Sequence, residues 1–471
     1  MTRARAPQDN SMWLINAMQN LGYRSNPGGV CHGLTCTWIE SALLNELDIF
    51  TSRLKYIRRR PHLHTKIKRI EKRLAEKKRI STHDKHTLTI KTFFDNIELS
   101  QQPELYPHLF DTTNQPIYQD IFLTSPLTMT DKLAAKGGIN KTADFSGIYS
   151  IDDLKKYLTS FRQAVINTNT TCPIAFSLSC MGHIIGLHYE LASDTWHLMN
   201  ASNLFPKKIR GITAAARMLA KSLYINKNDE HVCMSTHVFS TKADQRSATA
   251  CINTWMTSPI FQELHAISSE KANLIDSPYG ASWLHMAVDD NQVDIAEKLL
   301  QTGADVNLPR KDSQATPLHL AAESGRIKPI KLLIEYGANI NSSTPTNHAT
   351  PLFIAALNGH ANVIQYLLAC GANANIASIE SLSSFRELAK DFSFEKAAEE
   401  FISKKSTDNL IMIYPHEIAA LRGHQHCADL ITQYSTVSNP NRFFNKRKFE
   451  AIAIGSTFEK SAKKSKPMTN H

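Results

Sequence analysis

The chain has 471 residues, 42% of them hydrophobic, which is enough for two or three domains with ordinary cores. No window approaches the roughly 20 apolar residues of a membrane span, and no apolar signal core follows the first residues, so we expect a protein of the cytosol or nucleus. The eight cysteines are thinly spread and include no Cys-x-x-Cys pair, which argues against a disulfide framework and structural zinc.

The net charge of +10 is concentrated in two segments. Residues 53–91 contain 15 Lys and Arg against three acidic residues, and residues 440–471 contain 8 against two. Blocks of this kind bind nucleic acid, acidic lipid or acidic protein, or are simply solvated helix faces.

The N-terminal part of the chain predicts helices. A short helix is expected near residues 13–18, then a turn at 26–29. From Cys31 to about residue 50, apolar residues such as Leu34 and Trp38 recur at helical spacing. We therefore expect a long apolar helix that starts at Cys31.

The basic segment 53–91 is predicted as a helical insert, because Ile67, Ile70 and Leu74 form an apolar stripe. Its cations make it a candidate contact for nucleic acid or ribonucleoprotein, although no signature of an RNA or DNA reader occurs. The candidate basic patch consists of Arg58, Arg59, Arg60, Lys66, Lys68, Arg69, Lys72 and Arg73.

Residues 104–250 indicate a sheet flanked by helices. Helices are expected near 151–161 and 207–225. Strands are expected at 173–178, 183–189, 195–199 and 231–240. With helices first and strands later, residues 1–250 predict an α+β domain.

The C-terminal half contains a repeat with a period of 34 residues. Its landmarks are Ser282, Thr316 and Thr350 before one helix, and Gly303, Gly337 and Gly371 after the next. Threonine caps a helix, proline is tolerated at the first helical position, and glycine ends a helix in the left-handed conformation. Three clear units are expected at about 279–310, 311–345 and 346–378, and two degenerate ones extend to residue 435.

The Thr-Pro-Leu-His motif at Thr316 and its period resemble the ankyrin repeat. The resemblance implies an all-α solenoid over residues 251–435 that binds a protein partner. The residues expected to contact that partner are Trp283, His285, His319, Phe353, Asn358 and His360. Residues 436–471 are expected to form a mobile basic tail with possible nuclear-localisation clusters.

A second candidate site is centred on Cys31, which a glycine turn delivers to a helix start. The helix N-terminus favours the thiolate, the nucleophilic form of cysteine. A nucleophilic cysteine also needs a base and an orienting group. His183 begins one predicted strand and Asn200 ends the next, so these residues supply candidates for both roles.

This order of Cys, His and Asn resembles papain-like cysteine proteases, and the pattern Gly-x-Cys-x-Gly-Leu-x-x-x-Trp is similar to YopT-type bacterial effector proteases. The resemblance implies Cys31 as nucleophile, His183 as base and Asn200 as orienting residue, where those effectors usually carry Asp. Asn26 is a further candidate, as an oxyanion donor. No metal or cofactor is expected.

Several alternatives remain open at this stage. His188 or His197 can replace His183 as the base, and Cys36 is expected in the core. Cys31, Cys36 and His183 can together form a metal site, although their spacing is poor for zinc. The domain can also be an inactive, protease-shaped binding module.

The combination of such a cysteine domain with ankyrin repeats and a basic tail resembles Legionella-type ankyrin-repeat effectors. That resemblance implies secretion into a host cell, host cytoplasm or nucleus as location, and a host protein as the partner of the repeats. The expected function is that of a thiol hydrolase or protease, which uses its cysteine to hydrolyse that partner. The alternative is an inactive scaffold that modulates nuclear or nucleic-acid-associated complexes.

Overall fold

The computed structural model describes residues 12–23, 30–101, 130–225, 230–392, 394–405 and 409–437. It divides into two compact units, Met1–Ala338 and Asn339–His471, which we describe separately. Asn26 and residues 438–471, most of the predicted tail, lie outside the described residues.

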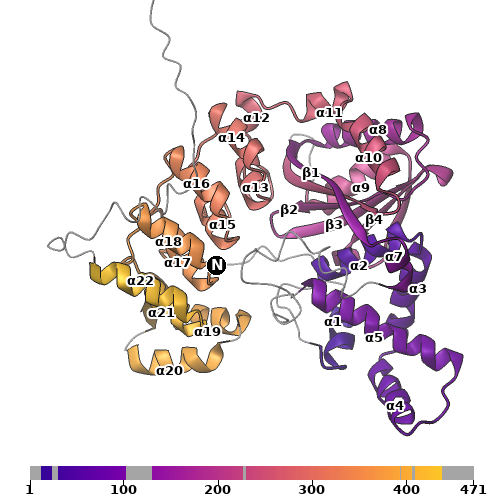
Figure 1. Ribbon diagram of the computed structural model, residues 1–471, viewed down its shortest axis with the longest axis horizontal. Helices are drawn as coiled ribbons and strands as arrows, with labels where there is room; N and C mark the ends of the chain where they lie inside the picture. Colours follow the sequence, from indigo (N-terminus) through magenta and orange to yellow (C-terminus); the bar gives the residue numbers. More distant parts are fainter. Residues whose placement is uncertain are drawn as a thin grey trace, which may run out of the picture. The chain divides into compact units, whose positions relative to one another are not determined.

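Six strands form one antiparallel sheet in the first unit, in the order β1-β6-β2-β3-β4-β5 (Figure 1). The strands are β1 (Ile139–Tyr149), β2 (Ala175–Cys180), β3 (His183–Glu190), β4 (Thr195–Asn200), β5 (Lys207–Arg210) and β6 (Val232–Thr241). This confirms the α+β class and the four predicted strands, while β1 and β5 were not predicted.

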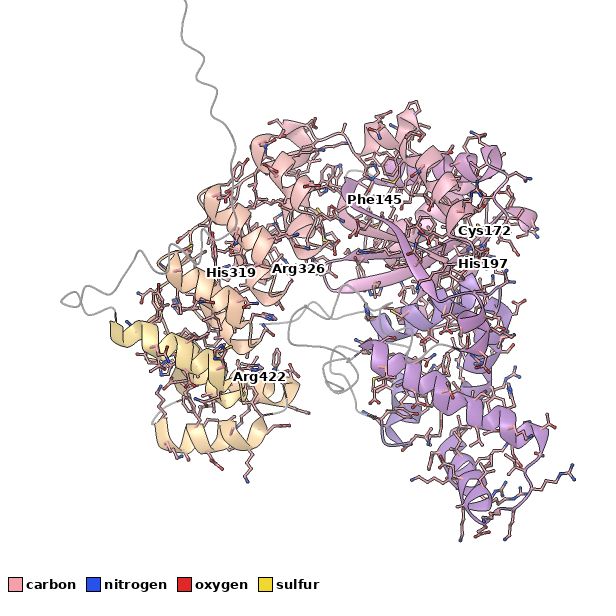
Figure 2. The ribbon with its side chains drawn as sticks, viewed as in Figure 1. Phe145, Cys172, His197, His319, Arg326 and Arg422 are labelled. Carbon is pink, nitrogen blue, oxygen red and sulfur yellow. The ribbon has the colours of Figure 1, made fainter. Side chains whose placement is uncertain are left out.

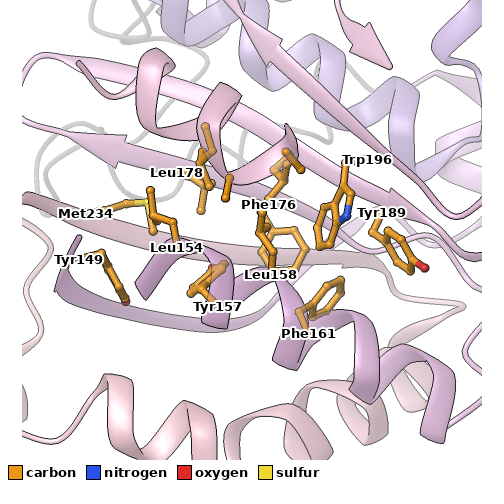
Figure 3. Close-up of a cluster of buried hydrophobic side chains, with 14 of the residues drawn as sticks. Tyr149, Leu154, Tyr157, Leu158, Phe161, Phe176, Leu178, Tyr189, Trp196 and Met234 are labelled. Atoms are coloured by element: carbon orange, nitrogen blue, oxygen red, sulfur yellow. The ribbon is translucent and has the colours of Figure 1, made fainter. Parts of the chain in front are cut away.

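One face of the sheet carries an aromatic core beneath helices (Figures 1 and 3). The ring of Phe161 meets that of Phe176 edge-to-face at 4.7 Å between centroids, and that of Trp255 at 5.0 Å. Such pairs add to the stability gained by burial. The covering helices are α8 (Ile151–Asn167), α9 (Ile212–Ser222), α10 (Gln245–Met256) and α11 (Pro259–Leu264).

The opposite face of the sheet packs against the apolar helix α2 (Cys31–Leu43), which begins at the predicted residue. Trp38 of α2 lies over Gly186 of β3, where a Cβ atom would come within 2.4 Å of the indole ring. On its other side, α2 approaches α5 (Thr82–Gln101) so closely that a Cβ at Gly33 would lie 2.0 Å from the Ile97 carbonyl oxygen. Two glycines therefore allow this helix to be clamped between the sheet and α5.

The basic segment forms helices, as predicted. Its helices are α3 (Leu47–Arg58), α4 (Leu63–Ala75) and α5. Two further helices, α1 (Met12–Gln19) and α7 (Asp131–Ala135), lie before and after it in the sequence. Ile67 and Ile70 of the predicted apolar stripe are buried, whereas Leu74, in the last turn of α4, is exposed.

The first two repeats belong to the same compact unit as the sheet. Trp283 donates its indole N–H to Ser146 Oγ of β1 at 3.0 Å, and Cys233 of β6 donates to the Ala281 carbonyl at 3.4 Å. The predicted domain boundary at residue 250 falls inside α10. The helices from there are α12 (Ser269–Asn273), α13 (Trp283–Asp289), α14 (Val293–Gln301), α15 (Pro317–Glu323) and α16 (Ile327–Glu335).

The second unit contains the third repeat and a departure from the predicted order. Helices α21 and α22 pack on the third repeat, whereas α19 and α20 pack on each other and beside a β7–β8 ribbon. The last pair therefore continues the stack, and the segment before it is an insertion rather than a consecutive degenerate repeat. The elements are α17 (Pro351–Leu357), α18 (Ala361–Ala369), β7 (Ser378–Ser381), α19 (Leu382–Asp391), α20 (Glu395–Lys405), β8 (Leu410–Ile413), α21 (Pro415–Leu421) and α22 (Gln425–Val437).

Arg422 ties the insertion to the stack in the second unit (Figure 2). Its guanidinium donates to the carbonyl oxygens of Leu357 at 3.1 Å and Phe392 at 2.5 Å, and lies 4.5 Å from the centroid of the Phe392 ring. Two backbone acceptors near separate helix ends are thereby satisfied by one side chain.

The close approach of α2 and α5 gives the first testable prediction. We expect Gly33→Ala to lower the free energy of unfolding by roughly 1–3 kcal/mol, because the new methyl group meets backbone atoms that cannot rotate away. Urea denaturation measures this change.

Gly337→Ala is the matched control, because its Cβ would meet open space and only its left-handed backbone (φ 84°) opposes the methyl group. We expect this control to cost about 1 kcal/mol. A loss for Gly33→Ala that is clearly smaller than that of the control would contradict the close packing of α2 and α5.

Candidate functional site

Cys31 is the first residue of α2, and its side chain is half-buried beside the core that α2 shares with the sheet. The partial positive charge and free N–H groups of the helix start favour a thiolate at this position. The other cysteine of the motif, Cys36, is buried as predicted, and burial raises the pKa of its thiol well above the ordinary value. The two thiols of α2 therefore differ in environment.

The hairpin between β2 and β3 lies at the same end of the sheet as Cys31. Cys180, the last residue of β2, pairs directly with His183, the first residue of β3. Burial raises the pKa of Cys180 to about 12, with a smaller contribution in the same direction from Cys31. The two thiols act on each other through space, so the start of α2 lies on the side of the fold that carries this hairpin.

His183 and Asn200 share one face of adjacent strands. Asn200 pairs with Ile185, two residues after His183, so all three side chains point to the same side. That side is opposite to the one on which Met199 packs against the α2 core. The His183 ring lies 5.5 Å from the ring of Tyr224.

The amide of Asn200 has a structural partner. Its Oδ1 accepts a hydrogen bond from the Ser202 backbone N–H at 2.9 Å and thereby caps the short helix η5 (Ala201–Asn203). An orienting role toward His183 must share this oxygen, which has a second lone pair.

The alternative bases His188 and His197 lie at the other end of the strand pair. His188 pairs with Ala175, at the start of β2, and with His197. It follows His183 by five positions, a distance of about 16 Å along β3. Burial lowers the pKa of His188 to about 4, and also lowers that of His197. The prediction of these two histidines as alternative bases is therefore corrected: both are buried in the fold.

Sequence reasoning missed a pair of residues on the α2 side of the sheet. His237 of β6 places Nε2 3.7 Å from Asp290 Oδ1 at the end of α13. His32 is close enough to His237 for the two rings to interact electrostatically, while burial is the main cause that lowers the His32 pKa to about 4. No local motif joins these residues, which come from α2, β6 and the first repeat.

The described residues do not form the metal site that Cys31, Cys36 and His183 were considered for. Across the described residues, no group of three or more His, Cys, Asp or Glu side chains is placed to hold a metal ion. Nor does any described helix have the length and apolarity needed to cross a membrane.

Four of the six residues predicted to contact a partner are buried. His319 Nδ1 lies 2.8 Å from Thr316 Oγ1 and caps α15, and His285 does the same with Ser282 at 2.9 Å. Phe353 packs in the core of the second unit, and Trp283 bonds to the sheet. The prediction is therefore corrected for the residues whose side chains serve the fold: Trp283, His285, His319 and Phe353.

Asn358 and His360 remain partly exposed at the turn between α17 and α18. Asn358 donates its side-chain N–H to the Ile354 carbonyl at 3.0 Å, and His360 is the N-cap of α18. Of the six residues, these two are the ones with surface available to a partner.

Some cations of the basic patch contact other side chains of the chain, and the others are exposed to solvent. The guanidinium of Arg60 lies 3.7 Å from the centroid of the Tyr56 ring, Lys66 donates to the Tyr56 hydroxyl at 3.4 Å, and Arg73 pairs with Asp84 at 3.4 Å. The remaining members are exposed: Arg58, Arg59, Lys68, Arg69 and Lys72.

The helix pairs carry capped starts, prolines at the first helical position and left-handed glycines at 303, 337 and 371, as predicted. A family model described as ankyrin repeats in three copies matches residues 248–344 and 284–378. These segments are ankyrin repeats. No curated protein matches the chain. Ankyrin repeats indicate a protein partner, so protein binding is the function that the C-terminal half supports.

The buried histidines predict an acid-sensitive fold. Because burial depresses the folded-state pKa of His188 to about 4, its neutral form stabilises the fold above about pH 6.5, and this stability is lost as the pH falls toward 4. Between pH 7 and pH 5 we expect a loss of about 2 kcal/mol from this ring alone.

Urea denaturation at the two pH values measures this dependence. His188→Asn keeps a side-chain N–H near the Ile174 carbonyl, which accepts from His188 Nδ1 at 2.8 Å, and is expected to reduce the loss by that amount. His426→Asn, at an exposed position, is the control that leaves the buried rings in place. An unchanged pH dependence in His188→Asn would show that this ring does not titrate below neutrality.

Proposed function

We propose that the chain binds a protein through its ankyrin repeats and acts on it by cysteine chemistry at Cys31. The observation that carries the catalytic part is the position of Cys31, which starts α2 near the end of the sheet where His183 begins β3. A thiol at a helix start favours the thiolate that nucleophilic catalysis needs, and we assign the role of base to His183 at the adjoining strand end.

In the proposed reaction, the Cys31 thiolate attacks a carbonyl carbon of the substrate and forms a bond between sulfur and carbon. His183 donates a proton to the leaving group as the bond from that group to the carbonyl carbon breaks. Water then attacks the thioester, His183 accepts its proton, and the bond between sulfur and carbon breaks, so that the Cys31 thiolate and protonated His183 are restored and a carboxylic acid leaves. The N–H groups at the start of α2 are suited to stabilise the oxyanion.

A papain-like domain of the YopT type, in an effector delivered to a host cell, is the finer form of this proposal. It is supported by the order of Cys31, His183 and Asn200 and by the shared strand face of the last two. The host cytoplasm or nucleus as location rests on the resemblance alone.

The second candidate function is a binding module without catalysis. The observation that favours it is the hydrogen bond from the Ser202 N–H to Asn200 Oδ1, an interaction that gives this side chain a structural role. In that case both halves of the chain would serve as docking surfaces.

Labelling by iodoacetamide across pH, with mass-spectrometric mapping of each cysteine, distinguishes the two functions. For an active site we expect Cys31 to react at least about tenfold faster than Cys370 near neutral pH, because a positioned thiolate is the reactive species. Cys370 is an exposed thiol in the second unit and serves as the internal control.

His183→Ala is expected to slow the reaction of Cys31 by about tenfold and to leave Cys370 unchanged. His188→Asn is the matched histidine control, because His188 lies at the far end of β3, and it should alter neither rate. Equal rates for Cys31 and Cys370, or no effect of His183→Ala, would exclude the catalytic proposal and leave the binding module.

A further inference from the structure

An open surface cavity of about 500 Å³ lies at the end of α3 and is lined by Lys55, Arg58, Arg59 and Phe205. Its volume falls within the roughly 300–1,000 Å³ of small-molecule sites. Three of its four lining residues are cations and the fourth is an aromatic ring. The cysteine chemistry proposed above uses none of them.

Lys55 and Arg58 of α3 and Arg59, its C-cap, share one face, because positions i, i+3 and i+4 are neighbours on a helix surface. No carboxylate of the described part of the chain forms an ion pair with them, and acids close in sequence pair elsewhere, Asp48 with Lys208 at 3.2 Å and Glu46 with Lys132. Like charges this close repel one another, and the negative end of the α3 dipole offsets only part of this repulsion. A bound anion would neutralise the rest of the repulsion.

The ring of Phe205 forms an aromatic wall of the cavity. A site that bound only an inorganic anion would not need such a ring. It stacks on Trp13 with 6.4 Å between centroids and 21° between planes, which fixes its orientation. The guanidinium of Arg58 lies 5.5 Å from the Phe205 centroid. Planar bases stack on aromatic rings and on arginine, while lysine and arginine bind phosphate.

The geometry points to a nucleotide as the ligand of this cavity, with its base against Phe205 and its phosphate between Lys55, Arg58 and Arg59. A phosphate joined to a planar base is common to a free nucleotide and to one unit of a single-stranded nucleic acid. Diffuse attraction to the basic insert is a different mode, because it needs neither the ring nor these three cations in particular.

Calorimetric titration of the full chain tests this assignment with three probes: AMP, inorganic phosphate, and a short single-stranded oligoribonucleotide. We expect AMP or the oligoribonucleotide to bind more tightly than phosphate. Arg58→Gln/Arg59→Gln should weaken that binding at least about tenfold, because it removes charged phosphate contacts. Phe205→Leu should weaken binding of the base-containing probes by about fivefold or more and leave phosphate binding unchanged.

Lys68→Gln/Lys72→Gln is the matched control, since it removes two exposed cations of α4 that do not line the cavity. We expect it to change affinity less than about twofold. Because Arg58 and Arg59 are exposed, their replacement leaves the core intact, which the thermal midpoint of each variant verifies. Tighter binding of the oligoribonucleotide, displaced by AMP, identifies a nucleic acid strand, and equal affinities identify the free nucleotide. Equal weakening by the control, equal affinity for phosphate and AMP, or no binding of either base-containing probe would overturn the assignment.

Discussion

The close packing of α2 against the sheet is the constraint on which the first unit depends. Without side chains at Gly33 and Gly186, the helix lies near enough to α5 and β3 to seal one face of the sheet, while a separate aromatic core fills the other. Because the helix is held along its length, its first residue is held at the strand ends. The environment of Cys31 is thus set by packing at positions that take no part in chemistry.

Much of this fold was predictable from local pattern, and the failures share a physical cause. The central strands and the capped helices of the repeats follow from apolar periodicity and helix-end residues. The strand β1 was missed because its first half is polar and its pairing with β6 spans distant parts of the chain. The strand β5 (Lys207–Arg210) is a short basic edge strand, which carries almost no apolar signal. The stacking of α21 and α22 on the third repeat is a tertiary contact that spacing alone does not reveal.

The candidate sites likewise divide into residues that a local pattern predicts and residues that only contacts between distant segments bring together. Cys31 at a helix start, and His183 and Asn200 on adjacent strands, were predictable, because a helix signal and two strand signals fix their places. The predicted docking residues failed for the reason that made them recognisable. A motif recurs in every repeat because each copy must cap the same helix and fill the same core, so its residues face inward, as His319 does. The pair of His237 and Asp290, and the cavity beside Phe205, join distant segments and leave no local pattern.

The hydrogen bond from Trp283 to Ser146 makes the first repeat part of the sheet domain rather than an addition to it. Ankyrin arrays usually gain and lose copies without disturbing their neighbours, since each copy contacts only the next. Here the first copy cannot be exchanged in that way, because its tryptophan donates a hydrogen bond to a strand of the sheet. Duplication and deletion can therefore act only on the distal copies. The array can change length at its distal end, while its first copy stays bound to the sheet.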